Sequence, residues 1–234
     1  MKGNLSIIIP ALNEEKNIKP LTEKIIKNLK KFKFEIIFVD DQSDDESKDI
    51  LINLSKKYKF FNPILRKKSR DLTQSCFDGI NKAKYKNILI MDADLQHDPK
   101  YIPQMLKLYN DDIDIVIGVR KLTSGKNKGL SEFRRFASVV LIYLFKIFKI
   151  KTSDPMSGFF MFKKKIYLDN KKYFFGKGFK ILADIMINSK KKLKTKDLHI
   201  NFNRRYESES KMNIRILLIL IQFYLRSIFI KLFI

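Results

Sequence analysis

The sequence predicts an α/β protein with a mostly parallel, doubly wound sheet, and three observations lead to this fold class. Short apolar runs rich in β-branched residues alternate with longer segments whose apolar residues recur at helical spacing. This β-α-β-α-β alternation is typical of a parallel sheet with helices packed on its faces. In addition, 45% of the 234 residues are hydrophobic, which is enough for one large domain with a full core.

The first hundred residues contain the clearest elements. The predicted strands are residues 5–9, 34–41, a weak strand near 63–65, and 88–91. The first helix, within residues 11–32, is identified by apolar residues at helical spacing, namely Ile18, Leu21, Ile25, Leu29 and Phe32. Asn13 is its expected N-cap, and Ser43 or Asp44 is expected to cap the next helix. A third helix is expected over residues 72–84.

Beyond residue 100 the alternation is less regular. Residues 112–121 read as a further strand, and residues 123–131 form a loop bearing glycine and lysine, of the kind that closes over ligands. Residues 132–150 are expected to form a helix that is apolar around most of its circumference. Residues 157–164 and 196–205 are later strand candidates.

Acidic residues follow three of the predicted strands. Right-handed crossovers place the ends of these strands at one edge of the sheet, where open α/β proteins bind their ligands. The acidic residues at this edge are Glu14, Glu15, Asp40, Asp41, Asp92 and Asp94. The D-x-D pattern of Asp92 and Asp94, followed by Gln96, offers hard oxygen ligands at a turn. Such ligands suit Mg²⁺ or Mn²⁺, whereas zinc would call for cysteine or clustered histidine.

Five motifs in order give the chain a resemblance to a known family. They are SIIIPALNEEKNI, FVDDQSDD, MDADLQHDP, DPMSGFFMFKK and RRYESESKM, and together they span about residues 4–212. The chain resembles the glycosyltransferase family 2 enzymes of GT-A fold, a Rossmann-like, mostly parallel sheet flanked by helices. More narrowly, it is similar to the synthases that transfer mannose or glucose to polyprenyl (dolichyl) phosphate.

This resemblance implies a role for individual residues. The residues expected to line the nucleotide-sugar pocket are Pro10, Leu12, Glu14, Val39, Asp40 and Asp41, with Asp92 and Gln96. Asp92, Asp94 and Gln96 are expected to hold the metal and the donor diphosphate. The residues expected around the transferred sugar and the acceptor phosphate are Arg120, Arg134, Ser138, Arg205 and Lys211. Arginine side chains suit phosphate oxygens because the guanidinium group binds them bidentately.

The implied reaction is transfer of a sugar from a nucleotide-diphosphate sugar to polyprenyl phosphate, with inversion and with Mg²⁺ or Mn²⁺ as cofactor. GDP-mannose and UDP-glucose both suit the motifs, and the D-x-D-x-Q pattern favours GDP-mannose. Three positions depart from the family pattern. Leu12 stands where an aromatic residue is common, the segment after Arg70 lacks a glycine, and Ser208 replaces a glycine.

The C-terminal segment is the most apolar part of the chain. We expect a catalytic domain over residues 1–210 and a membrane-associating segment over residues 211–234. Residues 213–234 are about long enough to span a bilayer, but Arg226 near the centre favours an amphipathic helix lying in the interface. With a single cysteine and no signal peptide, the expected location is the cytoplasmic face of the membrane, as a peripheral or monotopic protein.

The net charge of +23 leaves alternatives open. A strongly basic chain favours polyanionic partners, namely anionic lipid, phosphorylated substrates or nucleic acid. A basic nucleic-acid-binding protein is the rival from another class, but no nucleic-acid module is recognisable and the acidic strand ends would repel phosphate. A family 2 enzyme with a polysaccharide acceptor is the nearer rival. We expect an anionic membrane surface as a partner and no nucleic acid.

Overall fold

A seven-stranded sheet forms the centre of the described structure. The computed structural model describes residues 4–120, 148, 150–201 and 214–233. Within these residues the strand order is β3-β2-β1-β4-β6-β5-β7. The strands are β1 Leu5–Ala11, β2 Phe34–Asp40, β3 Ile64–Leu65, β4 Asn87–Ile90, β5 Ile115–Arg120, β6 Phe160–Lys163 and β7 Thr195–Ile200. All neighbours pair in parallel except β6, which runs antiparallel to β4 and to β5.

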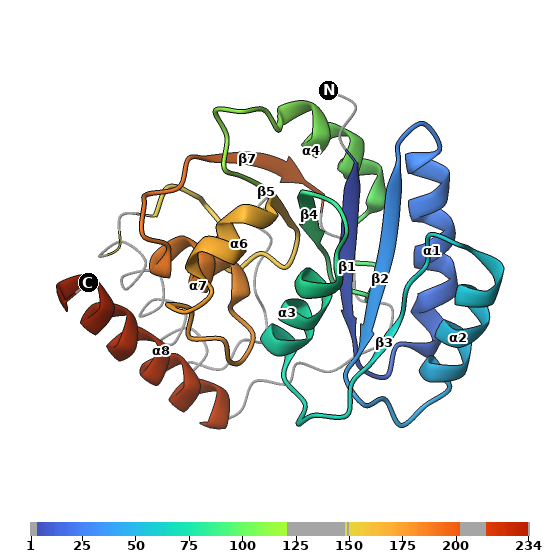
Figure 1. Ribbon diagram of the computed structural model, residues 1–234, viewed down its shortest axis with the longest axis horizontal. Coiled ribbons are helices and arrows are strands. Elements are labelled where there is room, and N and C mark those ends of the chain that lie inside the picture. Colours follow the sequence, from blue (N-terminus) through green and yellow to red (C-terminus); the bar gives the residue numbers. More distant parts are fainter. Residues whose placement is uncertain (1–3, 121–147, 149, 202–213, 234) are drawn as a thin grey trace, which may run out of the picture.

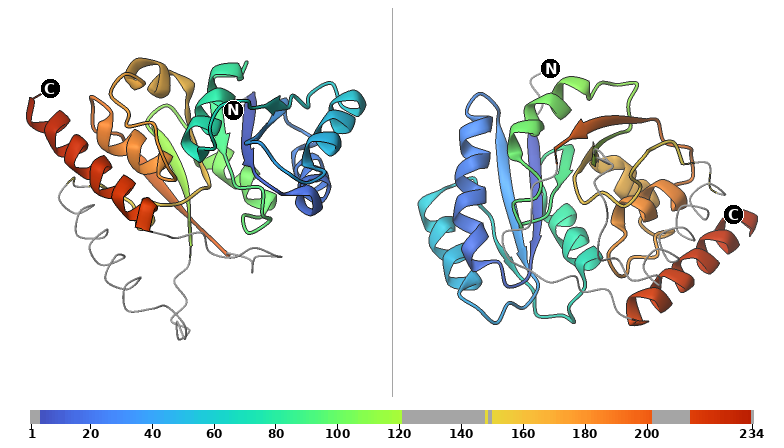
Figure 2. Two further views of the ribbon diagram at one scale, coloured as in Figure 1. Left: turned by 90° about the horizontal axis from the view of Figure 1, so that it is seen from below. Right: turned by 180° about the vertical axis from the view of Figure 1, so that it is seen from behind.

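Helices cover both faces of this sheet (Figure 1). They are α1 Glu15–Leu29, α2 Ser47–Lys57, α3 Leu72–Lys82, the 3₁₀ turn η1 Pro99–Tyr101, α4 Ile102–Leu108, α6 Lys164–Asn170, α7 Ile181–Asn188 and α8 Ile214–Phe233. Figure 2 shows from two further sides that α8 lies at the end of the molecule opposite α2.

Alternate residues of the strands face two separate apolar layers. Ile7 and Ile9 of β1 pack with α1, α2 and α4, whereas Ile8 of β1 packs with α3, α6 and α7. This period of two is the pattern of a strand buried on both faces. In α1, the helical spacing predicted a buried stripe, of which Ile18, Leu21, Ile25 and Leu29 are fully buried. Phe32, its last expected member, lies beyond the end of α1 and is only partly buried. The α/β fold class and its mostly parallel sheet are therefore confirmed.

Helix α8 has two different faces. Phe223 and Tyr224 are buried in a third apolar cluster with Ala183 and Ile187 of α7. On the other side Ile221, Leu225 and Phe229 recur every four residues and are 47%, 64% and 59% exposed. Within the described residues, no helix combines the length and the apolarity that crossing a bilayer requires.

Two of the expected helix caps are wrong. Helix α1 begins after Glu14, and α2 begins after Glu46, neither with a side-chain cap. Asn13 instead takes a left-handed φ of 58° and accepts a hydrogen bond from the backbone N–H of Asp44 (2.9 Å), while Ser43 accepts one from the N–H of Asn13 (2.9 Å). The two loops bind each other, and this tertiary contact replaces local capping. The helix expected over residues 132–150 lies almost wholly outside the described residues.

Candidate active site at the carboxyl edge of the sheet

The loops that leave the carboxyl ends of β1, β2 and β4 share an unusual backbone feature. Among the described residues, the non-glycine residues with positive φ are Asn13, Gln42 and Leu95, at 58°, 64° and 61°. One lies in each of these three loops, all at the same edge of the parallel strands. Left-handed backbone is costly for residues with a side chain and concentrates at functional sites, so this edge is the leading candidate for the site.

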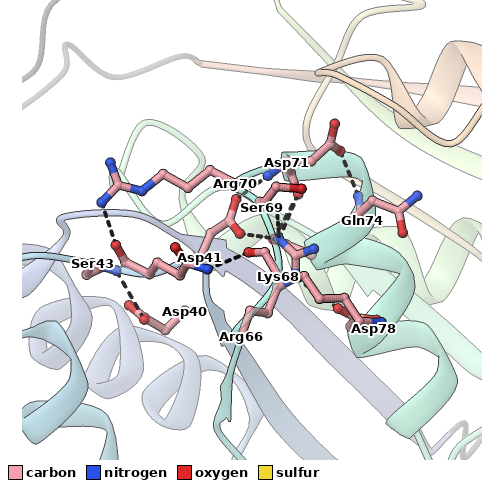
Figure 3. A network of polar contacts seen from close by, with 12 residues as sticks. Asp40, Asp41, Ser43, Arg66, Lys68, Ser69, Arg70, Asp71, Gln74 and Asp78 are labelled. Atoms are coloured by element: carbon pink, nitrogen blue, oxygen red, sulfur yellow. Dashed lines mark hydrogen bonds and ion pairs between the residues drawn. The ribbon is translucent and has the colours of Figure 1, made fainter.

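A buried arginine organises the part of the edge that follows β2 and β3. Arg66, whose side chain is 2% exposed, forms ion pairs with Asp41 and, at 2.9 Å, with Asp78 of α3. It also donates to Ser75 Oγ (3.1 Å), so the guanidinium group joins β2 to α3 (Figure 3). Asp40 is fully buried; its Oδ2 accepts from Ser43 N–H (3.2 Å), and its Oδ1 has no hydrogen-bond partner among the residues described.

Asp71 extends the network of Arg66 and Asp41 toward the N-terminus of α3. Its backbone N–H donates to Asp41 Oδ2 (2.7 Å), and its own Oδ1 accepts from the N–H of Gln74 (2.9 Å), which caps α3. Its Oδ2 accepts from the N–H of Gly178 (2.8 Å), a residue more than a hundred positions later. Asp71 therefore joins the loop after β2, the first turn of α3 and the chain around Gly178. Figure 3 shows Asp71 with Asp41 and Gln74.

The D-x-D residues lie where β4 ends. Asp94 is 8% exposed, and its Oδ1 accepts from the backbone N–H of Gln96 (3.1 Å). Asp92 is half-buried, and a Cβ added to Gly158 would come within 2.3 Å of its Oδ2. Only a glycine can therefore bring the backbone before β6 so close to this carboxylate.

The buried ring of His97 lies beside the D-x-D turn. Its Nδ1 lies 3.5 Å from Asp92 Oδ2, and its ring stacks on Phe159 with centroids 5.3 Å apart. Burial lowers the pKa of His97 to about 4, so the imidazole is neutral near pH 7. His97 therefore packs beside Asp92 and on Phe159 as an uncharged ring.

Arg120, the last residue of β5, is held in a fixed orientation by Asp154. Its Nε and Nη2 donate to both carboxylate oxygens of Asp154 at 2.7 and 3.0 Å, a bidentate pair. This hydrogen bonding raises the pKa of Arg120, and the charge of Asp92 raises it further.

Lys180, the residue before α7, is a second cationic group in this region. Burial, together with the nearby charge of Arg120, lowers the pKa of Lys180 to about 8, although Asp154 and Asp92 oppose the shift. Cationic and acidic groups thus converge here.

The structure brings together most of the residues that the sequence assigned to the nucleotide side. Pro10 lies in β1 and Val39 in β2, both buried, while Leu12 and Glu14 follow β1 and are partly exposed. Glu14 accepts a hydrogen bond from Asn17 Nδ2 at 2.7 Å. Four assigned residues, Arg134, Ser138, Arg205 and Lys211, lie outside the described residues, as does Ser208.

The donor set suits a hard divalent cation. Within the described ranges no group of three or more His, Cys, Asp and Glu side chains gathers as a complete metal site. Two carboxylates and an amide at one turn match the partial protein coordination of Mg²⁺ or Mn²⁺, which is completed by water and substrate phosphate. Asp92, Asp94 and Gln96 remain the candidate ligands on this chemistry.

Four charged residues of the site were not anticipated from the sequence: Arg66, Asp71, Asp154 and Lys180. Asp71 carried a usable signal, because D-x-x-Q before an apolar run is a helix-capping pattern. Asp154 lies in one of the five motifs. Arg66 and Lys180 are single basic residues in a lysine-rich chain, and their burial depends on partners that are distant in sequence.

The fold and this edge define the chain as an α/β protein with a candidate ligand site at the carboxyl ends of the strands. Residues 6–170 match the family described as glycosyl transferase family 2, and the chain belongs to this family. The chain is therefore a glycosyltransferase, and the resemblance seen in its five motifs is confirmed.

Two relatives named dolichol-phosphate mannosyltransferase match most of the chain. The chain is 35% identical over 213 residues to a dolichol-phosphate mannosyltransferase of Pyrococcus furiosus. This match covers 89% of the chain and 59% of that protein. The chain is 32% identical over 228 residues to the enzyme of the same name from Saccharomyces cerevisiae. That match covers 93% of the chain and 84% of the relative. The chain thus spans about three fifths of the archaeal relative and most of the yeast one.

Solved structures support the fold. Glucosyl-3-phosphoglycerate synthase from Mycobacterium tuberculosis, crystallised with Mn²⁺, uridine diphosphate and phosphoglyceric acid, superimposes with a TM-score of 0.67. The match covers 98% of this chain and 78% of the other at 14% identity, so it establishes the shared GT-A architecture and not the substrate.

Proposed function

We propose that this chain transfers mannose from GDP-mannose to a polyprenyl phosphate, giving polyprenyl-phosphate mannose and GDP. The observation that carries the proposal is the convergence of Asp92, Asp94 and Gln96 with the Arg120–Asp154 pair at one edge of the sheet. In this proposal the donor diphosphate binds at the D-x-D turn and the acceptor phosphate binds beside it, at Arg120. The relatives named dolichol-phosphate mannosyltransferase support the same acceptor and sugar.

The donor base is the open choice within this proposal. GDP-mannose is preferred because the relatives carry mannose in their name, whereas the solved mycobacterial synthase was crystallised with UDP. A UDP-glucose-using transferase with the same acceptor is the second candidate. Mg²⁺ or Mn²⁺ is the proposed cofactor, held by Asp92, Asp94 and Gln96. When bound, it supplies positive charge to the leaving diphosphate.

The protein residues mainly position two anions that would otherwise repel each other. The acceptor phosphate is already ionised, so the reaction needs no strongly basic residue to activate it. Arg120 offers its guanidinium group to the acceptor phosphate, and Asp154 holds it in one orientation. Lys180 adds positive charge to the same region, and its pKa of about 8 leaves it mostly protonated near pH 7.

The bond changes balance without an added reactant. An oxygen of the acceptor phosphate forms a bond to the anomeric carbon of the sugar. The bond from that carbon to the donor diphosphate breaks, and the nucleoside diphosphate leaves with the electron pair. Attack from the face opposite the leaving group inverts the anomeric configuration.

A transfer assay tests the proposal directly. Purified protein in detergent is incubated with polyprenyl phosphate and labelled GDP-mannose or UDP-glucose, with Mg²⁺, with Mn²⁺ or with excess EDTA. We expect label in the organic phase from GDP-mannose, dependent on the metal. Transfer from UDP-glucose alone would move the donor assignment to the second candidate. Absence of transfer from either donor would contradict the proposed reaction.

We further propose that α8 lies in the interface at the cytoplasmic face of an anionic membrane, as a peripheral or monotopic anchor. A polyprenyl acceptor resides in the bilayer, and Ile221 and Leu225 present an exposed apolar stripe on the side of α8 that faces away from α7. Lys231 near the end of α8 and the net charge of +23 add attraction to anionic lipid.

The variant Leu225→Glu tests this placement. A charge on the exposed stripe is expected to weaken binding to vesicles of anionic and neutral lipid by about tenfold or more, since burial of one large apolar side chain contributes about 1.5–3 kcal/mol. Vesicle sedimentation measures the binding. Leu168→Glu, at a leucine that is 49% exposed on α6, is the matched control and should bind vesicles like the wild type. Equal vesicle binding by the Leu225 and Leu168 variants would contradict the placement of α8.

A further inference from the structure

The segment from Phe175 to Lys180 lies between the nucleotide side of the site and α8. Its two glycines have positive φ values of 69° and 83°, at Gly176 and Gly178. This backbone conformation suits glycine and allows the segment to turn sharply just before α7. Figure 1 shows the chain between α6 and α7 passing close to the end of α3 and to α8.

Asp184, on the first turn of α7, holds the beginning of this segment. Its Oδ1 accepts from the N–H of Phe175 (2.9 Å), and its Oδ2 accepts from the N–H of Gly176 (2.8 Å). Asn188 Nδ2, one turn further along α7, also donates to Oδ1 (2.7 Å). Asp184 is only 3% exposed, and such a buried carboxylate requires several donors of this kind. All three of its described donors fix the segment or its own helix.

The end of the segment contacts the residues beside Asp41. The N–H of Gly178 donates to Asp71 Oδ2 (2.8 Å), and the carbonyl of Gly178 accepts from Thr73 N–H (3.0 Å) and Thr73 Oγ1 (2.8 Å). The carbonyl of Gly176 accepts from Gln74 Nε2. Since Asp71 in turn donates its N–H to Asp41, the segment supports the carboxylate that is assigned to the nucleotide pocket.

The other side of the segment contacts α8. The rings of Phe175 and Phe223 meet edge-on with centroids 5.8 Å apart, and a Cβ on Gly178 would lie 3.0 Å from Ile219. Asn188 Nδ2 also donates to Ser227 Oγ at 3.2 Å. The donor side of the site and the C-terminal helix therefore share one support, with Asp184 at its centre.

We infer that Asp184 is a positioning residue for the donor pocket, acting through the segment from Phe175 to Lys180 on Asp71 and Asp41. The inference rests on the proposed function for the identity of the ligand, a nucleoside diphosphate. Asp184 does not contact the reacting atoms. Its role is to fix two backbone N–H groups, so that Gly178 meets Asp71 at hydrogen-bond distance and the pocket is formed before the nucleotide arrives.

The variant Asp184→Asn tests the inference by changing one oxygen. The amide keeps the volume but turns one acceptor into a donor, so that Phe175 or Gly176 loses its partner. We expect the Kd for GDP or UDP, measured by calorimetry with Mn²⁺, to rise about tenfold. We also expect faster hydrogen exchange at the amides of Gly178 and Asp71. Asp169→Asn, at an exposed aspartate of α6, is the control and should leave both measurements unchanged.

The two measurements separate this inference from the proposed function. Unchanged nucleotide affinity in a folded Asp184→Asn protein, or faster exchange confined to Phe175 and Gly176, would overturn the inference and leave the transferase proposal standing. If the wild type binds neither nucleotide, the exchange at Gly178 and Asp71 still decides the positioning role. Should Asp184→Asn fail to fold, Thr73→Val removes one bond to the Gly178 carbonyl at nearly constant volume. It is expected to raise the Kd about threefold, and an unchanged Kd would count against the inference.

Discussion

Replacing Asp94 by alanine is expected to lower kcat for sugar transfer by about a thousandfold, which corresponds to roughly 4 kcal/mol of transition-state stabilisation. Asp94 is a proposed ligand of the divalent metal, and the charge that the metal supplies to the leaving diphosphate is lost with it. Its carboxylate also holds the turn through Gln96 N–H. Initial rates of labelled lipid formation at saturating donor measure the effect.

A second substitution separates charge from shape at this position. Asp94→Asn keeps an oxygen that can accept from Gln96 N–H, so the turn is retained while the negative charge is removed. We expect it to lose nearly as much activity as the alanine variant. Asp112→Asn, at an exposed aspartate before β5 at the opposite edge of the sheet, should have normal kcat. Normal rates in either Asp94 variant would remove this residue from the metal site.

Replacing Arg66 by methionine is expected to lower the free energy of unfolding by about 3–5 kcal/mol. The side chain of Arg66 is 2% exposed and that of its partner Asp41 is 8% exposed, so the substitution leaves a carboxylate with little access to water. Asp78 also loses its ion pair, but it is 29% exposed and water can replace part of that interaction. Urea unfolding followed by circular dichroism measures the change.

Two comparisons test the reason for this effect. Arg70→Ala breaks a pair with Asp44 in which the side chains are 45% and 72% exposed, so its cost should stay within about 1 kcal/mol. The double variant Arg66→Met, Asp41→Asn should recover part of the loss, because it no longer buries an unpaired charge. A single Arg66→Met variant as stable as Arg70→Ala would show that the buried pair contributes little to stability.

The fold was largely predictable because its signals are local. The stripe from Ile18 to Leu29 and the apolar run before Asp92 each reveal an element without reference to the rest of the chain. The direction of β6 was not predictable. Its run of apolar residues indicates a strand. Whether that strand pairs parallel or antiparallel with its neighbours depends on the path of the preceding segment, which the run itself does not reveal. The caps failed for a similar reason, since Asn13 bonds to the loop after β2 instead of to its own helix.

In the candidate site, too, the residues that are neighbours in sequence were predictable and those with distant partners were not. The D-x-D turn was identified because both carboxylates and Gln96 are neighbours in sequence. Arg66 could not be singled out, since its partners lie 25 residues before it and 12 residues after it. Asp184 could not be connected with Phe175 and Gly176 either, because these contacts become apparent only when α7 is placed beside that segment.

The antiparallel direction of β6 has a consequence for how such enzymes diversify. β5 ends at Arg120 and β6 begins at Phe160, both at the edge that holds the site, and Gly118 N–H donates to the Phe159 carbonyl at 2.8 Å. The chain between them therefore leaves and returns at one place, where Arg120 and Asp154 join its two ends. A change in the length of the chain that connects these two ends therefore need not alter the register of the sheet. Evolution can thus vary this connection while β1, β2 and β4, which carry the D-x-D turn and Asp41, keep their pairing.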